Sequence, residues 1–237
     1  MAALPGNVLD DPSLRNRSGV FADRPEAGTM LAKMLRKTGG GEPLVLAIPS
    51  GGIPVGIAVQ RGLGGSLALM PVRKLVIPFE PEAGFGAISW DGEIVLNEAL
   101  VSSIDLTTEH IERSMLLARR ELQRRMERFG VGDELPEMAG RRVILVDDGL
   151  ASGFTMLAAL RSAKRYHPLE TVVAVPTGSL GAVGVVASEA SLVCCLNVRS
   201  GPSFAVADAY RHWHDIADDE AARMLGVASG RKREKVA

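Results

Sequence analysis

The sequence predicts an α/β protein built on an open, mainly parallel β-sheet flanked by helices. Short runs of apolar, often β-branched residues alternate along the chain with stretches in which apolar residues follow helical spacing. This alternation is typical of parallel sheets, because parallel strands need crossover connections and these are usually helices. The predicted core strands cover residues 44–48, 67–72, 143–146, 171–175 and 191–198.

The composition favours a globular enzyme in a reducing cytoplasm. The chain has 237 residues, of which 46% are hydrophobic, and its formal net charge of −1 gives no overall field that favours nucleic acid. No apolar run approaches the ~20 residues needed to cross a membrane, and the first residues do not resemble a signal peptide. Cys194 and Cys195 are neighbours in a predicted strand and should point to opposite faces, which favours two thiols over a disulfide.

The most informative stretch covers residues 143–155. Four apolar residues predict a short buried strand, and two adjacent carboxylates, Asp147 and Asp148, follow it directly. A loop of small residues then leads into helical spacing from Met156. Backbone N–H groups at a helix start are unpaired and lie at the positive end of the helix dipole, so this loop suits a phosphate. The acids suit a neighbouring diol, and the predicted ligand is therefore a sugar phosphate.

This stretch resembles the phosphoribosyl pyrophosphate signature of type I phosphoribosyltransferases. That signature is a hydrophobic strand, two acids, two variable residues and a loop that ends in Gly, any residue, and Thr or Ser. The resemblance implies that Asp147 and Asp148 form the catalytic pair and hold the ribose hydroxyls. It also implies that the 5′-phosphate binds to the loop residues Ala151, Ser152, Gly153, Phe154 and Thr155. A solvated Asp pair in an ordinary strand–turn–helix is the alternative, whereas the sequence contains no Walker-type loop.

A second glycine-bearing loop follows the first predicted core strand. Ser50, Gly51 and Gly52 lie between that strand and a predicted helix at about residues 54–61. By resemblance this loop holds pyrophosphate, often with a strained or cis peptide bond. The related bacterial and archaeal group usually carries Arg where this chain has Ser50, which weakens the expected charge contact with pyrophosphate.

The first predicted helix opens at Asp23. Glu26 follows three residues later in a capping-box arrangement, and Pro25 falls in the first turn, where proline is tolerated. Residues 21–28 also resemble the opening of the same uncharacterised group of phosphoribosyltransferase-like proteins. A packing helix without a chemical role is the favoured interpretation of this segment.

The second predicted strand ends at two cations, Arg73 and Lys74. They are candidate contacts for phosphate or pyrophosphate, with surface charge as the alternative. Residues 76–97 contain two short β patterns around a hairpin turn at Asp91–Gly92. In type I enzymes a mobile flap at this position closes over the reacting sugar, so the resemblance implies a flap here that excludes water.

Two further regions are candidates for binding. Pro176 and Thr177 follow the fourth predicted strand, and ligands of open α/β sheets bind beyond the carboxyl ends of strands, so this loop should border the site. A long helix at residues 107–129 carries an arginine-rich face. We interpret that face as solvated because glutamates are interspersed, and a grip on a polyanion is the alternative.

The predicted organisation is a single phosphoribosyltransferase-like domain at residues 21–228. Within it we expect the flap at about 76–97 and a small C-terminal hood at about 199–228, where Tyr210 and Trp213 could stack on a base. We expect residues 1–20 to be irregular and residues 229–237 to form a basic tail.

The resemblance implies an enzyme that transfers the 5-phosphoribosyl group of phosphoribosyl pyrophosphate to a nitrogenous base in nucleobase salvage. Pyrophosphate is released, and Mg²⁺ is the expected cofactor. Substrate and water would ligate the ion, with Asp147 or Asp148 as protein ligands, because no other carboxylate cluster accompanies the pair.

One loop position limits the choice of base. Ala151 cannot accept the proton that an Asp accepts there in some purine enzymes, so the loop is nearer to the adenine type. A non-catalytic regulatory protein that binds phosphoribosyl pyrophosphate is the alternative function. The expected partners are phosphoribosyl pyrophosphate and an unidentified base, without nucleic acid or membrane, and a homodimer is left open.

Overall fold

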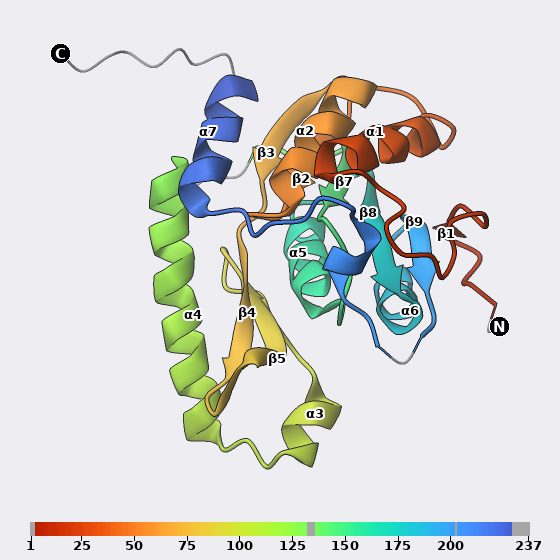
Figure 1. The fold of residues 1–237 in the computed structure, drawn as a ribbon. Coiled ribbons are helices and arrows are strands. Elements are labelled where there is room, and N and C mark those ends of the chain that lie inside the picture. The colour runs from red at the N-terminus through yellow and green to blue at the C-terminus, as the bar shows by residue number, and fades with distance from the viewer. Residues whose placement is uncertain (1–2, 132–135, 202, 229–237) are drawn as a thin grey trace.

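The computed structural model describes residues 3–131, 136–201 and 203–228 (Figure 1). Its central feature is a six-stranded sheet in which all neighbouring strands are parallel, as the sequence predicts. In spatial order the strands are β1 (Val8–Leu9), β9 (Leu192–Arg199), β8 (Glu170–Ser179), β7 (Arg142–Val146), β2 (Leu44–Ala47) and β3 (Ser66–Leu69).

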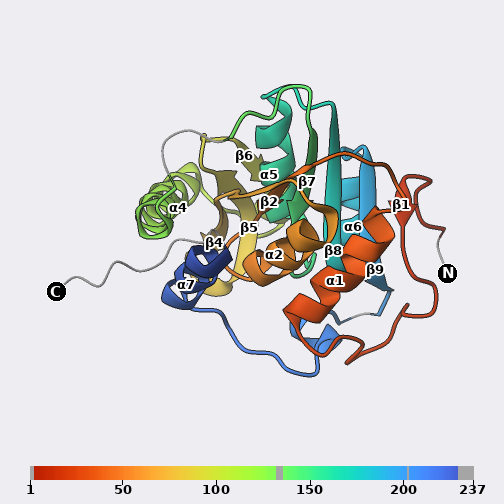
Figure 2. The ribbon, with the colours of Figure 1, turned by 90° about the horizontal axis from the view of Figure 1, so that it is seen from above.

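Helices cover both faces of this sheet (Figure 2). One face packs on α1 (Arg24–Leu35) and α2 (Gly52–Leu63), and the other packs on α5 (Phe154–Lys164) and α6 (Leu180–Ala187). Successive strand residues alternate between the two cores because side chains in a strand alternate in direction. Cys194 and Cys195 show this alternation, since they lie in opposite cores as buried free thiols, as predicted.

A second, antiparallel sheet follows β3 in the chain. It contains β4 (Val72–Ile77), β5 (Glu80–Ser89) and β6 (Ile94–Leu96) in that order. The predicted hairpin at Asp91–Gly92 is confirmed, with Gly92 at φ 86°. The predicted strand at residues 67–72 is wrong at its end, because β3 stops at Leu69 and β4 begins at Val72. Pro71 between them has no N–H to donate to a sheet ladder.

The second sheet is packed on both faces. One face contacts α3 (Glu98–Ser103) and α4 (Thr108–Phe129) through a cluster that includes Leu75, Phe85 and Ile88. The other face adds Val72, Ala87 and Val95 to the core that contains α5. Buried side chains therefore anchor the region of the expected flap on both faces. Moving this region away from the rest of the protein would expose both apolar clusters to water.

The long helix and the C-terminal helix lie side by side. Helix α4 begins after Thr107, whose hydroxyl caps the N–H of His110, and ends at Gly130 in the left-handed conformation. Helix α7 (Asp218–Ala228) packs near the end of α4 and against α2 (Figure 1). A 3-10 turn, η1 (Val206–Ala209), precedes α7 and contacts β8.

Two other expectations are corrected. The segment after residue 175, which the sequence analysis predicted to be a loop, belongs to a strand. Strand β8 continues to Ser179 and pairs with β9 at Thr177–Asn197. The N-terminal segment is not wholly irregular, since β1 adds to the sheet beside β9.

The predicted basic tail at residues 229–237 lies outside the described residues. In the described part of the chain, no helix is both long and apolar enough to span a membrane.

The contact between α1 and α2 depends on Gly28. A Cβ there would lie 2.6 Å from the Val55 carbonyl oxygen and 2.8 Å from the Ala58 Cβ. We expect Gly28→Ala to lower the free energy of unfolding by about 1–3 kcal/mol, measured by urea denaturation, because backbone atoms must shift. Gly184→Ala in α6 is the matched control, since a Cβ there meets nothing within 4 Å, and it should stabilise by about 0.5–1 kcal/mol. Equal effects of the two changes would contradict this account.

Candidate functional site

The predicted acidic pair follows the carboxyl end of β7 and is held by contacts from distant parts of the chain. Asp147 Oδ1 accepts a hydrogen bond from the Asp148 N–H at 2.8 Å. Asp148 Oδ2 accepts one from Arg24 Nε at 2.9 Å, and the Asp148 carbonyl oxygen accepts one from the Tyr210 hydroxyl at 2.7 Å. The start of α1 and the C-terminal segment therefore fix the position of the pair.

The signature loop joins the acidic pair to α5. Ala151 and Ser152 are exposed, and Gly153 precedes the helix at φ 85°, a conformation that favours glycine. No side chain caps the helix start. Leu150 anchors the loop to β8, because its N–H donates to the Thr177 carbonyl at 2.9 Å and its carbonyl accepts from the Ser179 N–H at 3.0 Å. The helix start is thus fixed in position with amide groups suited to an anion.

The second predicted loop lies against the acidic pair. It follows β2, the immediate neighbour of β7, and its Pro49–Ser50 peptide bond is cis, as the resemblance implied. A Cβ on Gly51 would lie 2.0 Å from Asp148 Oδ2, and one on Gly52 would lie 2.7 Å from the Val146 carbonyl oxygen. Only glycine allows this approach, so the structure brings the two loops together as the sequence analysis expected of one site.

Arg24 is a site residue that the sequence analysis missed. It is only 5% exposed, and besides Asp148 it donates from Nη1 to the His214 carbonyl at 2.9 Å. Its guanidinium carbon lies 3.7 Å from the ring centroid of Trp213 and 5.9 Å from that of Tyr210. A signal was present, because a cation in the first turn of α1 opposes the helix dipole and needs another partner.

This arrangement also changes the interpretation of the two aromatic residues. Tyr210 is buried and donates its hydroxyl proton to the backbone at Asp148, while Trp213 packs on Arg24. Burial, with the charge of Asp148, raises the pKa of Tyr210, so the hydroxyl stays protonated. In the structure both rings support the acidic pair, whereas the sequence analysis assigned them to stacking on a base.

The two carboxyl groups differ in their electrostatic surroundings. Burial raises the pKa of Asp147 well above its ordinary value, and the charge of Asp148 raises it further. Burial also raises the pKa of Asp148, although Arg24 opposes this shift by charge and by its hydrogen bond. Among the described residues, no cationic side chain forms an ion pair with Asp147. Its carboxylate would therefore be stabilised by a hydroxyl donor or a bound cation.

The remaining predicted residues do not contact the acidic pair through their side chains. The Thr177 hydroxyl is buried and donates to Asn197, and Pro176 is buried beside it in β8. Arg73 lies within β4, with Nη2 3.8 Å from Glu121 of α4, and the aliphatic part of Lys74 packs on Gly84 of β5. Thr177 supports the site through its carbonyl, and a phosphate contact by Arg73 or Lys74 stays a prediction.

The donor set agrees with a magnesium ion shared with a substrate. In residues 3–131, 136–201 and 203–228, no three His, Cys, Asp or Glu side chains are placed to hold a metal. Asp147 and Asp148 supply the carboxylate oxygens that Mg²⁺ prefers, while the rest of its shell would come from substrate and water. Burial raises the pKa of Asp147, and a bound cation would stabilise its ionised form.

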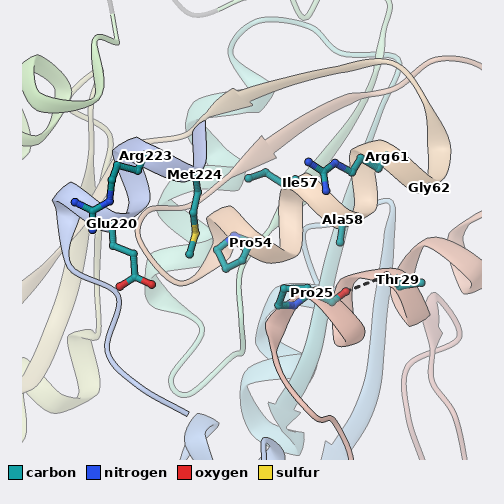
Figure 3. Close-up of a pocket in the computed structure, with 10 residues that line it drawn as sticks. All are labelled: Pro25, Thr29, Pro54, Ile57, Ala58, Arg61, Gly62, Glu220, Arg223 and Met224. Carbon is teal, nitrogen blue, oxygen red and sulfur yellow. Dashed lines mark hydrogen bonds between the residues drawn. The ribbon is translucent and has the colours of Figure 1, made fainter. Parts of the chain in front are cut away.

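A groove of about 690 Å³ lies between α1, α2 and α7 (Figure 3). Its lining is mainly apolar, with charged side chains from α2 and α7 at its edges. The lining residues are Pro25, Thr29, Pro54, Ile57, Ala58, Arg61, Gly62, Glu220, Arg223 and Met224. None of them is a predicted site residue, so this groove is distinct from the acidic pair and its loops.

Paired acids, an open helix start and a glycine loop thus come together beyond the carboxyl ends of the adjacent parallel strands β7 and β2. Residues 94–179 match the family model described as the phosphoribosyl transferase domain. Two curated proteins of Mycobacterium tuberculosis, from strains H37Rv and CDC 1551, are named as candidate phosphoribosyl transferases. Each is 39% identical to this chain over 212 residues, which are 88% of this chain and 47% of the relative.

A solved structure is similar to this chain along most of its length. The crystal structure of TT1426 from Thermus thermophilus is 36% identical, with a TM-score of 0.71, and the match covers 86% of this chain and 97% of that one. The chain therefore belongs to the type I phosphoribosyltransferase family, as the signature predicted. It spans about half the length of the curated relatives it matches.

Because the pKa of Asp147 is raised, ionising this carboxyl at neutral pH lowers the free energy of unfolding. The folded state holds this proton more tightly than the unfolded state, so the stabilisation from protonation is complete below about pH 4 and is lost as the pH rises through the folded-state pKa. We expect Asp147→Asn to raise Tm at pH 7 by roughly 2–4 °C, a gain of about 1 kcal/mol in a chain of this size, and to change it little below about pH 4. Thermal unfolding across this pH range measures the effect, with Glu42→Gln as an exposed control. A Tm lowered at pH 7 would contradict the account.

The ion pair between Arg24 and Asp148 should be a coupled unit. Arg24→Met leaves the Asp148 carboxylate uncompensated and should lower the free energy of unfolding by about 3 kcal/mol. Adding Asp148→Asn removes that charge and should recover about 1 kcal/mol or more. Urea denaturation of both single variants and the double variant measures the coupling. Strictly additive effects would show that the two side chains act independently.

Proposed function

We propose that this protein binds phosphoribosyl pyrophosphate with Mg²⁺ and transfers the 5-phosphoribosyl group to a nitrogenous base with release of pyrophosphate. The observation that carries the proposal is the contact between the acidic pair after β7 and the glycine loop after β2. These loops would place a sugar between two anion-binding groups, which matches a pentose with phosphate at one end and pyrophosphate at the other.

Each part of the substrate has a proposed partner. Asp147 and Asp148 accept hydrogen bonds from the ribose hydroxyls, and the backbone amides of residues 151–155 bind the 5′-phosphate at the start of α5. The loop from Ser50 to Gly52 binds pyrophosphate at the start of α2, where no side chain caps the helix.

The chemistry separates the sugar from pyrophosphate before the new bond is complete. As the bond from C1 of ribose to the pyrophosphate oxygen breaks, positive charge develops on the sugar, and a ring nitrogen of the base attacks C1. The carboxylates of Asp147 and Asp148 are fixed next to that charge and stabilise it. Magnesium, when bound, neutralises charge on the departing pyrophosphate. The side chain of Val206 packs over Gly149 and covers one side of the loop.

The acceptor is proposed to be a nucleobase in a salvage reaction. Ala151 provides no group that accepts a proton from the base, which favours a base that reacts without such help from this loop position. The same observation favours a second candidate, a regulatory protein that binds phosphoribosyl pyrophosphate without turnover.

Calorimetry and an activity assay separate the two candidates. We expect isothermal titration with phosphoribosyl pyrophosphate and Mg²⁺ to show binding. We also expect pyrophosphate release with at least one base from a panel of adenine, hypoxanthine, guanine and uracil. Binding without release on any acceptor would favour the regulatory protein, and absence of binding would reject both functions.

The role of the acids has a separate test. Replacing Asp147 and Asp148 with Asn should weaken binding of phosphoribosyl pyrophosphate by about 100-fold, because two charge-assisted hydrogen-bond acceptors are lost. Circular dichroism should show an intact fold, and Glu42→Gln should bind like the wild type. Unchanged affinity of the double variant would remove the acids from the binding site.

A further inference from the structure

The predicted pyrophosphate loop is in contact with a carboxylate from the C-terminal helix. The Ser50 hydroxyl donates to Asp218 Oδ1 at 2.9 Å, and Asp218 is the first residue of α7. The two residues are 168 positions apart in the chain, so the contact exists only because α7 packs between α2 and α4. A negative group thus lies at the loop where the proposed function places a pyrophosphate.

Arg125 of α4 completes this arrangement. Its Nε donates to Asp218 Oδ2 at 3.1 Å, its Nη2 donates to Asp218 Oδ1 at 2.8 Å, and the same Nη2 lies 3.2 Å from the Ser50 hydroxyl oxygen. Both charged side chains are only 18% exposed. A planar guanidinium that donates two parallel hydrogen bonds fits a phosphate group as well as a carboxylate. Arg125 could therefore exchange one anion for the other without changing its own position.

The surroundings favour an anion at this place. Gly51 precedes α2 with no side-chain cap, so the positive end of that helix faces the loop. Burial raises the pKa of Asp218, but hydrogen bonds from Arg125 and Ser50 outweigh it, so the net shift is downward and the carboxylate stays charged. A cavity of about 410 Å³ borders Asp218, and its lining combines three arginines with two further carboxylates: Arg124, Arg125, Arg128, Glu121 and Glu127. The arginine-rich face of α4 is thus partly an interface with the acidic start of α7, whereas the sequence analysis favoured a solvated face.

We propose that Arg125 binds the pyrophosphate end of the substrate and that Asp218 holds the same position as an internal competitor. This inference rests on the proposed function, because it assigns a ligand to the loop of Ser50. Ser50 carries no charge, and Arg125 supplies from α4 the positive charge that the loop itself lacks. Pyrophosphate displaces the Asp218 carboxylate from Arg125 and Ser50 when it binds, so α7 tunes the affinity of the site.

Two substitutions with opposite expected effects test the proposal. We expect Arg125→Gln to weaken binding of inorganic pyrophosphate with Mg²⁺ by tenfold or more, measured by isothermal titration, because the paired donor is lost. We expect Asp218→Asn to strengthen it by about 3–10-fold, because a neutral amide competes less well for Arg125. Arg125→Lys should recover part of the affinity, since it keeps the charge without the planar fork.

Matched controls carry the same charge changes at neighbouring positions. Arg120→Gln removes a positive charge from the exposed face of α4. Asp219→Asn removes a carboxylate that is 71% exposed and 3.5 Å from Arg128. Both should change pyrophosphate affinity by less than about twofold, because exposed charges are screened. If Arg125→Gln and Asp218→Asn behave like these controls, or if Asp218→Asn weakens binding, the inference is overturned.

Ribose 5-phosphate separates this inference from the proposed function. It lacks pyrophosphate, so the Arg125 and Asp218 variants should bind it like the wild type if the fold and the signature loop are intact. A wild type that binds phosphoribosyl pyrophosphate, together with an Arg125→Gln variant of equal affinity, rejects the role of Arg125 and leaves the proposed function standing. A wild type that binds neither phosphoribosyl pyrophosphate nor pyrophosphate rejects both.

Discussion

The site depends on the placement of two neighbouring carboxylates in partly buried surroundings at the end of β7. Bringing two like charges together away from water is unfavourable, and the protein offsets this for only one of them. Arg24 donates to Asp148 from the start of α1, whereas Asp147 has a hydrogen bond from the backbone and no ion pair among the described residues. The acid without a cationic partner is the group with which a sugar hydroxyl or a metal ion can interact to greatest effect.

Much of the support for this pair comes from segments that carry no signature. Tyr210 holds the backbone of Asp148, and Trp213 covers the guanidinium of Arg24. The carbonyl of His214 takes a further hydrogen bond from Arg24. The C-terminal segment therefore acts as the outer layer of the acidic site, and it continues directly into α7.

The second sheet and α4 also support groups near the proposed site. Because β4, β5 and β6 are packed on both faces, they hold α4 in a fixed position along the edge of the molecule (Figure 1). That position brings Arg125 to the loop of Ser50 and gives α7 a surface on which to pack. A region that resembles a mobile flap by its place in the chain thus also serves as a support for charged groups.

Local features of the fold could be predicted from the sequence. Three examples depend on residues close together in the chain, whose periodicity and spacing are visible directly: the strand at residues 143–146, the capping residue Asp23 and the signature loop. The strand predicted at residues 171–175 is present as β8, but its predicted end was wrong because it depends on residues far away in the chain. A strand's length depends on its neighbour, and Asn197 of β9 satisfies the polar groups of Thr177 that otherwise indicate a loop.

The sequence by itself determined the alternation of strands and helices, the acidic pair and the small-residue loop that follows it. Only the tertiary structure decided which charges accompany them, because Arg24 and Asp148 are 124 positions apart, and Arg125 and Asp218 are 93 apart. The physical reason is that an ion pair is fixed by distance in space, and that distance depends on how helices pack on the sheet.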